Sequence, residues 1–204
     1  MARGLKPLPA ALGFRVKSGW AMVVLLAAPS NKPQLMKCGP ILLSDPEIPG
    51  SKQPFHAALE LPQKEARAVS KELQKVVRDA AKKSAKELLN EAEELRLDVR
   101  TASLVVGSTV DPATLHNEHI RAHALEGQLF RAALEDALGG LGIRCSVLVE
   151  KSAYASAAPE LRRSAGEIKR AVATLGESHE GSWRAEEKLA ALGAWIALTM
   201  RMAK

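Results

Sequence analysis

The order of elements after residue 62 constrains the fold more than any other feature of this sequence. A basic amphipathic stretch from Pro62 to about Arg96 is followed by an apolar run, Val99–Val106. A second amphipathic stretch, about 113–138, precedes a second apolar run, 143–150. Proline is well tolerated in the first turn of a helix, so Pro62 fits a helix start. Strands that alternate with helices of this length must be parallel, because each helix carries the chain back across the sheet.

The first sixty residues predict antiparallel strands joined by short turns. Gly19–Ala28 is an apolar run that is too short to cross a bilayer. The turn residues Pro29–Pro33 separate it from a second predicted strand, Gln34–Leu43. After a loop rich in proline and glycine, Phe55–Leu61 is predicted as a short third strand.

Two predicted helices, about 157–175 and 183–202, end the chain. The complete order is therefore β-β-β-α-β-α-β-α-α, which predicts an α/β fold with a mixed sheet and helices on both faces. We expect a single domain over residues 1–204, with residues 1–12 as a flexible N-terminal segment.

Composition narrows the class of protein. The 204 residues are 47% apolar and 25% charged, which is typical of a folded globular chain. The formal charge of +6 suits a polyanionic partner. Cys38 and Cys145 lack ligand-type spacing and are expected to be buried free thiols. Because the basic N-terminal stretch is interrupted by prolines and charges, it does not read as a signal peptide, and we expect a soluble cytoplasmic protein with no membrane partner.

Two short segments resemble a known family. Ser18–Val24 (SGWAMVV) is similar to the end of a first-strand signature in which an Asp-Pro-Gly turn leads into Thr-Gly-Tyr/Trp-Gly/Ala. Glu187–Gly193 (EKLAALG) is similar to an Asp-x-x-Asp-Ala-Leu-Ala segment in the last helix of the same family. With the element order, these segments resemble the ribonuclease H superfamily, and within it the RuvC-type Holliday-junction resolvases. The resemblance implies a ribonuclease-H-like mixed sheet and an association with nucleic acid.

The sequence departs from this family at the residues that carry its chemistry. The family holds two Mg²⁺ ions with four carboxylates, which activate water and stabilise the leaving oxygen. Here the stretch before Ser18, which the resemblance assigns to the family's first strand, carries Arg15 and Lys17 but no acid, and the strand that ends at Gly107 lacks a Glu at its tip. In the last helix Glu187 fits the first acidic position, whereas Ala190 occupies the second. The resemblance therefore implies an altered or lost nuclease site.

A group of histidines is the most unusual local feature. At helical spacing His116, His119, His123 and Glu126 share one face, close to the carboxyl edge of the predicted sheet. Two imidazoles at i and i+4 together with a carboxylate can bind Zn²⁺ or Mn²⁺, or can transfer protons. The alternative is a hydrogen-bonded structural network. His56 is a further candidate, although a structural role fits it better.

The long predicted helix carries a continuous basic stripe, about 33 Å long. Its members are Lys64, Arg67, Lys71, Lys75, Arg78, Lys82 and Lys86. A stripe of this length can follow a nucleic-acid backbone. Acidic residues flank the stripe and reduce its charge. The alternative interpretation is therefore an ordinary solvated helix face.

These observations lead to two functional hypotheses. The first is a nucleic-acid-associated, metal-dependent phosphodiester hydrolase that uses Mg²⁺ or Mn²⁺. Its catalytic residues would be His119, His123, Glu126 and Glu187, and Asp111 would join them as a metal ligand. Its phosphate-binding residues would be Lys17, Arg121, Lys71, Lys75, Arg78 and Lys82. The second is a non-catalytic binding or assembly module that keeps the fold. A homodimer contact, another protein partner or a small ligand at the sheet edge are further candidate interactions.

Overall fold

A five-stranded mixed sheet forms the centre of the computed structural model, which describes residues 6–29 and 32–202. The strands are β1 (Leu8–Lys17), β2 (Trp20–Ala27), β3 (Gln34–Leu42), β4 (Leu97–Val106) and β5 (Arg144–Val149). They lie in the order β3-β2-β1-β4-β5. β1, β2 and β3 pair antiparallel, whereas β4 pairs in parallel with both β1 and β5. The mixed sheet predicted from the element order is confirmed.

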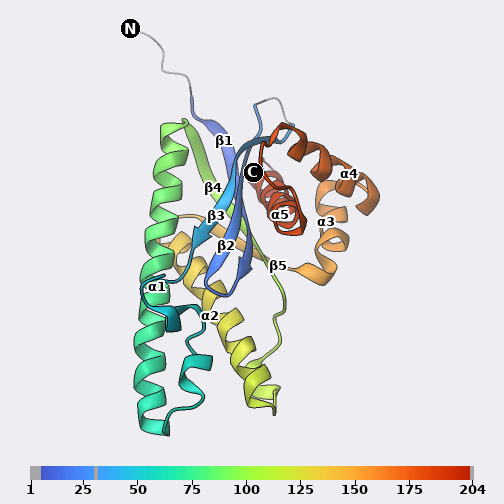
Figure 1. Ribbon diagram of the computed structural model, residues 1–204. Helices are drawn as coiled ribbons and strands as arrows, with labels where there is room; N and C mark the ends of the chain where they lie inside the picture. Colours follow the sequence, from blue (N-terminus) through green and yellow to red (C-terminus); the bar gives the residue numbers. More distant parts are fainter. Residues whose placement is uncertain (1–5, 30–31, 203–204) are drawn as a thin grey trace.

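Helices cover both faces of this sheet (Figure 1). They are α1 (Gln63–Glu94), α2 (Glu118–Gly140), α3 (Ala153–Leu161), α4 (Ala165–Leu175) and α5 (Ala185–Met202). α1 and α2 pack on one face, and α5 packs on the other with α3 and α4 outside it. Within the described residues, no helix has both the length and the apolar composition needed to span a membrane.

Strand β1 is central and buries both of its faces. Leu12 and Phe14 join the core beneath α1 and α2, while Ala11 joins the core beneath α5. Gly13 also faces α5, and a Cβ at this position would lie 2.8 Å from Ala194 Cα and closer still to backbone atoms of α5. A glycine is therefore required for the close approach of strand and helix.

The structure corrects two assignments at the N-terminal end. Residues 1–12 were expected to be flexible, but β1 begins at Leu8, and Ala10 and Leu12 are fully buried. Residues 1–5 of that segment, together with Ser30 and Asn31 of the predicted turn, lie outside the described residues. Phe55–Leu61 is not a strand, because the chain there forms a short 3₁₀ helix, His56–Ala58. The three early strands are therefore β1, β2 and β3.

Two helix boundaries also differ from the prediction. The helix expected at about 157–175 is divided into α3 and α4, because Arg162 adopts a left-handed conformation (φ 50°). Ser164 then starts α4 with a capping box that includes Glu167. α2 begins at Glu118 rather than near residue 113, because the Asn117 side chain accepts a hydrogen bond from the Ile120 N–H and caps the helix there.

Candidate functional site at the carboxyl edge of the sheet

The parallel strands β1 and β4 end at the same edge of the sheet, where open α/β sheets bind ligands. A cavity of about 260 Å³ lies at this edge. Its lining includes Arg15 and Lys17 from β1, Gly107 after β4, and His123 from α2. The polar groups of this cavity are therefore mainly cationic or imidazole groups.

Arg15 is the buried charge of this edge. Only 4% of the residue is exposed. Its Nη1 donates a hydrogen bond of 2.7 Å to the Val16 carbonyl oxygen, and its Nη2 donates to Glu150 Oε2 just beyond the end of β5. The Glu150 carboxylate thus compensates a guanidinium that would be costly to bury alone.

The other carboxylates of this edge are also engaged. Glu186, in the first turn of α5, lies 3.3 Å from Lys17 Nζ. Its own backbone N–H and then the hydrogen bond and charge of Lys17 lower the pKa of Glu186. Glu187 Oε2 accepts a hydrogen bond of 2.8 Å from the Arg184 N–H, so this carboxylate caps the start of α5.

These residues do not fit the pair of Mg²⁺ ions that the family resemblance implies. Magnesium requires oxygen ligands, chiefly carboxylates, in an anionic site. β1 carries the cations Arg15 and Lys17 and no acid, and Glu150 is paired with Arg15. Glu187 points to a backbone amide, and Ala190 offers no ligand atom. No magnesium-dependent step can be derived from this edge.

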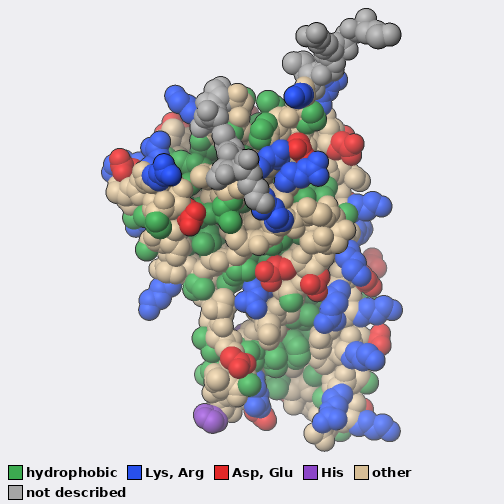
Figure 2. Space-filling view, turned by 180° about the vertical axis from the view of Figure 1, so that it is seen from behind, with side chains coloured by type: hydrophobic (Ala, Val, Ile, Leu, Met, Phe, Trp, Pro, Cys, Tyr) green, Lys and Arg blue, Asp and Glu red, His purple; other side chains and the backbone are tan. Residues whose placement is uncertain are grey.

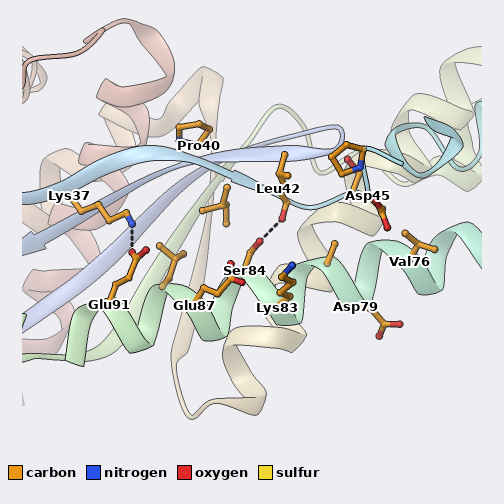
Figure 3. A pocket seen from close by; sticks show the side chains of 15 residues that line it. Lys37, Pro40, Leu42, Asp45, Val76, Asp79, Lys83, Ser84, Glu87 and Glu91 are labelled. Carbon is orange, nitrogen blue, oxygen red and sulfur yellow. Dashed lines mark hydrogen bonds and ion pairs between the residues drawn. The ribbon is translucent and has the colours of Figure 1, made fainter. Parts of the chain in front are cut away.

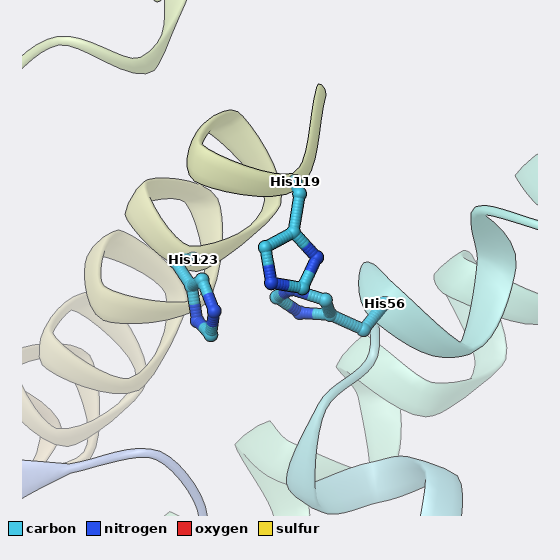
Figure 4. Close-up of side chains that lie close together, drawn as sticks. All are labelled: His56, His119 and His123. Atoms are coloured by element: carbon cyan, nitrogen blue, oxygen red, sulfur yellow. The ribbon is translucent and has the colours of Figure 1, made fainter. Parts of the chain in front are cut away.

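Three histidines form a second polar group on the α2 face, here called the histidine cluster. His119 and His123 stand one turn apart on α2, and His56 approaches them from the 3₁₀ helix that precedes α1 (Figure 4). The ring centroids are 4.6 Å apart for His56 and His119, 4.2 Å for His56 and His123, and 4.7 Å for His119 and His123. The three rings therefore converge from two distant segments.

Glu126 lies on the buried side of this cluster and contacts two of its rings. Its side chain is wholly buried. Its Oε1 accepts hydrogen bonds from His56, at 2.8 Å from the ring Nδ1 and 3.2 Å from the backbone N–H. Its Oε2 has no hydrogen-bond partner and lies 3.9 Å from His123 Nδ1. The structure thus brings together His119, His123 and Glu126 as predicted, and adds His56, which sequence alone could name but not place.

The remaining predicted ligands lie elsewhere. Asp111 caps a 3₁₀ helix by accepting the Ala113 N–H, and its side chain is exposed. Glu187 lies on the opposite face of the sheet from the histidine cluster. His116 is exposed in the connection before α2, because the helix begins two residues later. Arg121, expected to hold phosphate, lies 3.6 Å from Glu118 on the same helix.

The basic stripe of α1 is solvent-exposed along its whole length. Figure 2 shows Lys and Arg side chains following the edge of the molecule that α1 forms, with acidic side chains between them. The exposed members are Lys64, Arg67, Lys71, Lys75, Arg78, Lys82 and Lys86. Among the described residues, none of these seven takes part in an ion pair.

A further cavity, of about 620 Å³, lies between the edge strand β3 and α1 (Figure 3). Lys37 pairs with Glu91 across it, and Ser84 Oγ donates to the Leu42 carbonyl oxygen at 2.7 Å. These polar groups satisfy one another and hold the strand to the helix. Asp45, Asp79, Lys83 and Glu87 also line this cavity.

The two cysteines are unsuited to nucleophilic chemistry. Burial and then the charge of Glu187 raise the pKa of the Cys38 thiol to about 11. Burial and then the charge of Glu135 raise the pKa of Cys145 to about 11 as well. Both thiols are free and half-buried, and at neutral pH they stay protonated.

Comparison with known proteins identifies the fold. No protein-family model matches the chain, and no curated protein matches it. The Thermus thermophilus RuvC structure is similar, with a TM-score of 0.55 and 12% identity over 95% of this chain and 96% of that one. T. thermophilus RuvC in complex with a Holliday junction substrate gives a TM-score of 0.52, with 12% identity over 95% of both chains. The chain has a ribonuclease-H-like fold of the RuvC type.

Proposed function

We propose that this protein binds nucleic acid through phosphate contacts and does not hydrolyse it. The observation that carries the proposal is the buried pair of Arg15 and Glu150 at the carboxyl edge of the sheet. This pair puts a buried guanidinium in the strand that, by the family resemblance, would carry a metal-binding acid. The site is thereby unsuited to paired Mg²⁺ ions, while the fold and the basic surface remain suited to a polyanion.

The basic stripe of α1 supports binding to a phosphate backbone. Its cations are exposed and unpaired, so each can approach a phosphate without first breaking an ion pair. Phosphate contacts of this kind release counterions and give affinity with little sequence preference. The similar RuvC structure that holds a Holliday junction substrate supports nucleic acid as the class of partner.

The experiment that tests this proposal is fluorescence anisotropy with labelled duplex, single-stranded and four-way-junction DNA and matched RNA, between 50 and 200 mM salt. One variant replaces four cations of the stripe, Lys71, Lys75, Arg78 and Lys82, by alanine. The matched control replaces four exposed cations elsewhere, Lys32, Lys151, Arg170 and Arg184. Both variants change the net charge equally, so a difference between them reports the position of the contact.

We expect the stripe variant to lose affinity and to reduce the salt slope by about 3.6, since each of four duplex phosphate contacts contributes about 0.9. The control variant should keep most of the slope. Equal losses in the two variants, or no binding at 50 mM salt, would contradict the proposal. Incubation of the same substrates with Mg²⁺ or Mn²⁺ should leave them intact, and specific cleavage would contradict the absence of catalysis.

The second candidate function, a metal-dependent phosphodiester hydrolase, is favoured by one observation. The histidine cluster and Glu126 combine possible metal ligands with a possible proton acceptor, and His123 also lines the cavity at the sheet edge. Glu187 and Asp111, which that hypothesis requires at the same site, are engaged elsewhere. The cleavage assay therefore decides between the two functions.

A further inference from the structure

A purely structural role does not explain the geometry of the histidine cluster. Three imidazoles with ring centroids 4.2 to 4.7 Å apart are brought together at the surface, and His119 and His123 are exposed. An ordinary structural network would satisfy these nitrogens with hydrogen bonds. Instead, apart from the contacts to Glu126, no hydrogen bond to these rings is found among the described residues.

His56 is held in a fixed orientation. Its Nδ1 faces Glu126 Oε1 at 2.8 Å, and its backbone N–H donates to the same oxygen at 3.2 Å. The opposite ring nitrogen, Nε2, is buried and has no partner. If Nδ1 carries the proton that Glu126 accepts, Nε2 has its lone pair available for a metal ion. This carboxylate–histidine arrangement is the one that orients imidazole ligands in metal sites.

Glu126 supplies a second observation that points to a cationic ligand. Its carboxylate is wholly buried, yet Oε2 lacks a hydrogen-bond partner. A buried carboxylate with an unsatisfied oxygen is unfavourable unless positive charge lies nearby. A divalent ion held by the three rings would supply that charge at short range and would strengthen the interaction with His56.

The three imidazole nitrogens indicate which metal ions this cluster would bind. One nitrogen atom from each of His56, His119 and His123 lies within 4.8 Å of the others. In a tetrahedral site with Zn–N bonds of about 2.0–2.1 Å, two ligand atoms stand roughly 3.3 Å apart. Imidazole ligands favour Zn²⁺ and similar transition metals over Mg²⁺, which prefers oxygen.

We propose that His56, His119 and His123 form a binding site for a divalent transition metal ion of the Zn²⁺ type. Glu126 is the positioning residue of this site, because it acts through the ring of His56. Three histidines leave a fourth coordination position, which opens to solvent beside the two exposed rings. The bound ion connects the segment before α1 to the first two turns of α2. The site stands independently of the proposed nucleic-acid binding.

The test uses the whole protein after treatment with a chelator, and Zn²⁺ alone as the probe. Isothermal titration calorimetry measures the affinity and stoichiometry, and Co²⁺ is added separately to record the visible absorption of its tetrahedral complex. The variants are His56→Ala and His119→Ala. The matched control is His116→Ala, which removes an exposed histidine three residues before His119 and outside the cluster.

We expect one Zn²⁺ per chain and a melting temperature raised by about 5 °C or more when Zn²⁺ is at 100 times its Kd. His56→Ala and His119→Ala should each weaken binding at least tenfold and remove the visible Co²⁺ bands, while His116→Ala should bind as the parent does. Circular dichroism without metal verifies that each variant is folded. Absence of binding in the folded parent, or equal affinity in the His56 and His116 variants, would overturn the site.

Glu126→Gln tests the positioning role separately. Glutamine keeps the size of the side chain and an acceptor for His56 but removes the negative charge. We expect Zn²⁺ affinity to fall by roughly 10- to 100-fold, as for other carboxylates that orient metal-binding histidines. The melting temperature without metal should change much less than the melting temperature with Zn²⁺. An unchanged Zn²⁺ affinity would exclude this role for Glu126.

Discussion

The two faces of the sheet use the same strands but pack in different ways. On the α5 face, small residues such as Gly13, Ala190 and Ala194 let the helix approach the strand backbone closely. On the α1 and α2 face, large side chains such as Phe14 and Phe130 keep the helices farther out. A cavity of about 980 Å³ lies on the α5 side, where β4 and β5 meet the ends of α3 and α5. The other side carries the histidine cluster at its margin.

The fold is kept here although its polar side chains do not occupy the positions that the family resemblance implies. At the position where the family resemblance implies a second acid in the last helix, Ala190 is fully buried and its backbone carbonyl approaches Gly13. The carboxylates that remain near this helix cap its start or pair with Lys17. Two buried polar atoms that lack a hydrogen-bond partner among the described residues, His56 Nε2 and Glu126 Oε2, lie on the α2 side.

The largest expected effect tests the close contact on the α5 face. Gly13→Ala should destabilise the protein by about 3 kcal/mol, because the new methyl group meets backbone atoms of α5 that cannot rotate away. Gly127→Ala on α2 is the matched control, since a Cβ there meets nothing within 4 Å. We expect the control to be neutral or stabilising by up to about 1 kcal/mol. Urea denaturation measures the free energy of unfolding of both variants. Similar losses for Gly13→Ala and Gly127→Ala would contradict the closer packing on the α5 face.

A smaller effect is expected for the cations at the carboxyl edge. Arg15→Met should cost about 2 kcal/mol, because it leaves Glu150 without its cation. The cost is limited because the Glu150 side chain is 42% exposed and can be hydrated. Lys17→Met should cost under about 0.5 kcal/mol, since its pair with Glu186 is screened by solvent. If the two variants were equally stable in urea denaturation, the Arg15 pair would not be the stronger one.

The smallest expected effect concerns the far end of α5. Desolvation raises the pKa of Asp98, but hydrogen bonds and charges from Arg201 and Arg100 outweigh it, so the pKa is lowered overall. A lowered pKa adds stability above the unfolded pKa of about 3.9, and this stability is lost as pH falls through the folded value. Asp98→Asn should therefore cost under about 1 kcal/mol at pH 7 and less at pH 3. An equal loss of stability in Asp98→Asn at pH 7 and at pH 3 would exclude this contribution from the lowered pKa of Asp98.

Much of the fold could be predicted from local pattern. The helix from Pro62 to about Arg96 and the strand near Val99–Val106 were predicted within a few residues, because their periodicity is long and regular. β1 was missed because Pro7, Pro9 and Arg15 interrupt its apolar pattern. Its role as a central strand follows from its pairing with β4, which is not a local property.

The site was less accessible to sequence reasoning. The i and i+4 spacing of His119 and His123 placed them on one face, as the structure confirms. Their contact with His56, and the contact of Arg15 with Glu150, join residues more than 60 positions apart along the chain. One missed feature had a local signal, since the Ser164 and Glu167 pair is the pattern of a capping box and marks the start of α4.

The parallel pairing of β1 with β4 has a consequence for synthesis on the ribosome. β1 aligns Leu8 with Leu97, so the whole of α1 must leave the exit tunnel before the middle of the sheet can close. Until then one edge of β1 lacks a neighbouring strand, and such edges promote aggregation. α5 follows all five strands in the chain and covers the residues around Gly13. We therefore expect the nascent chain to complete its core only once α5 has emerged, with the early hairpins depending on α1 or on chaperones for protection.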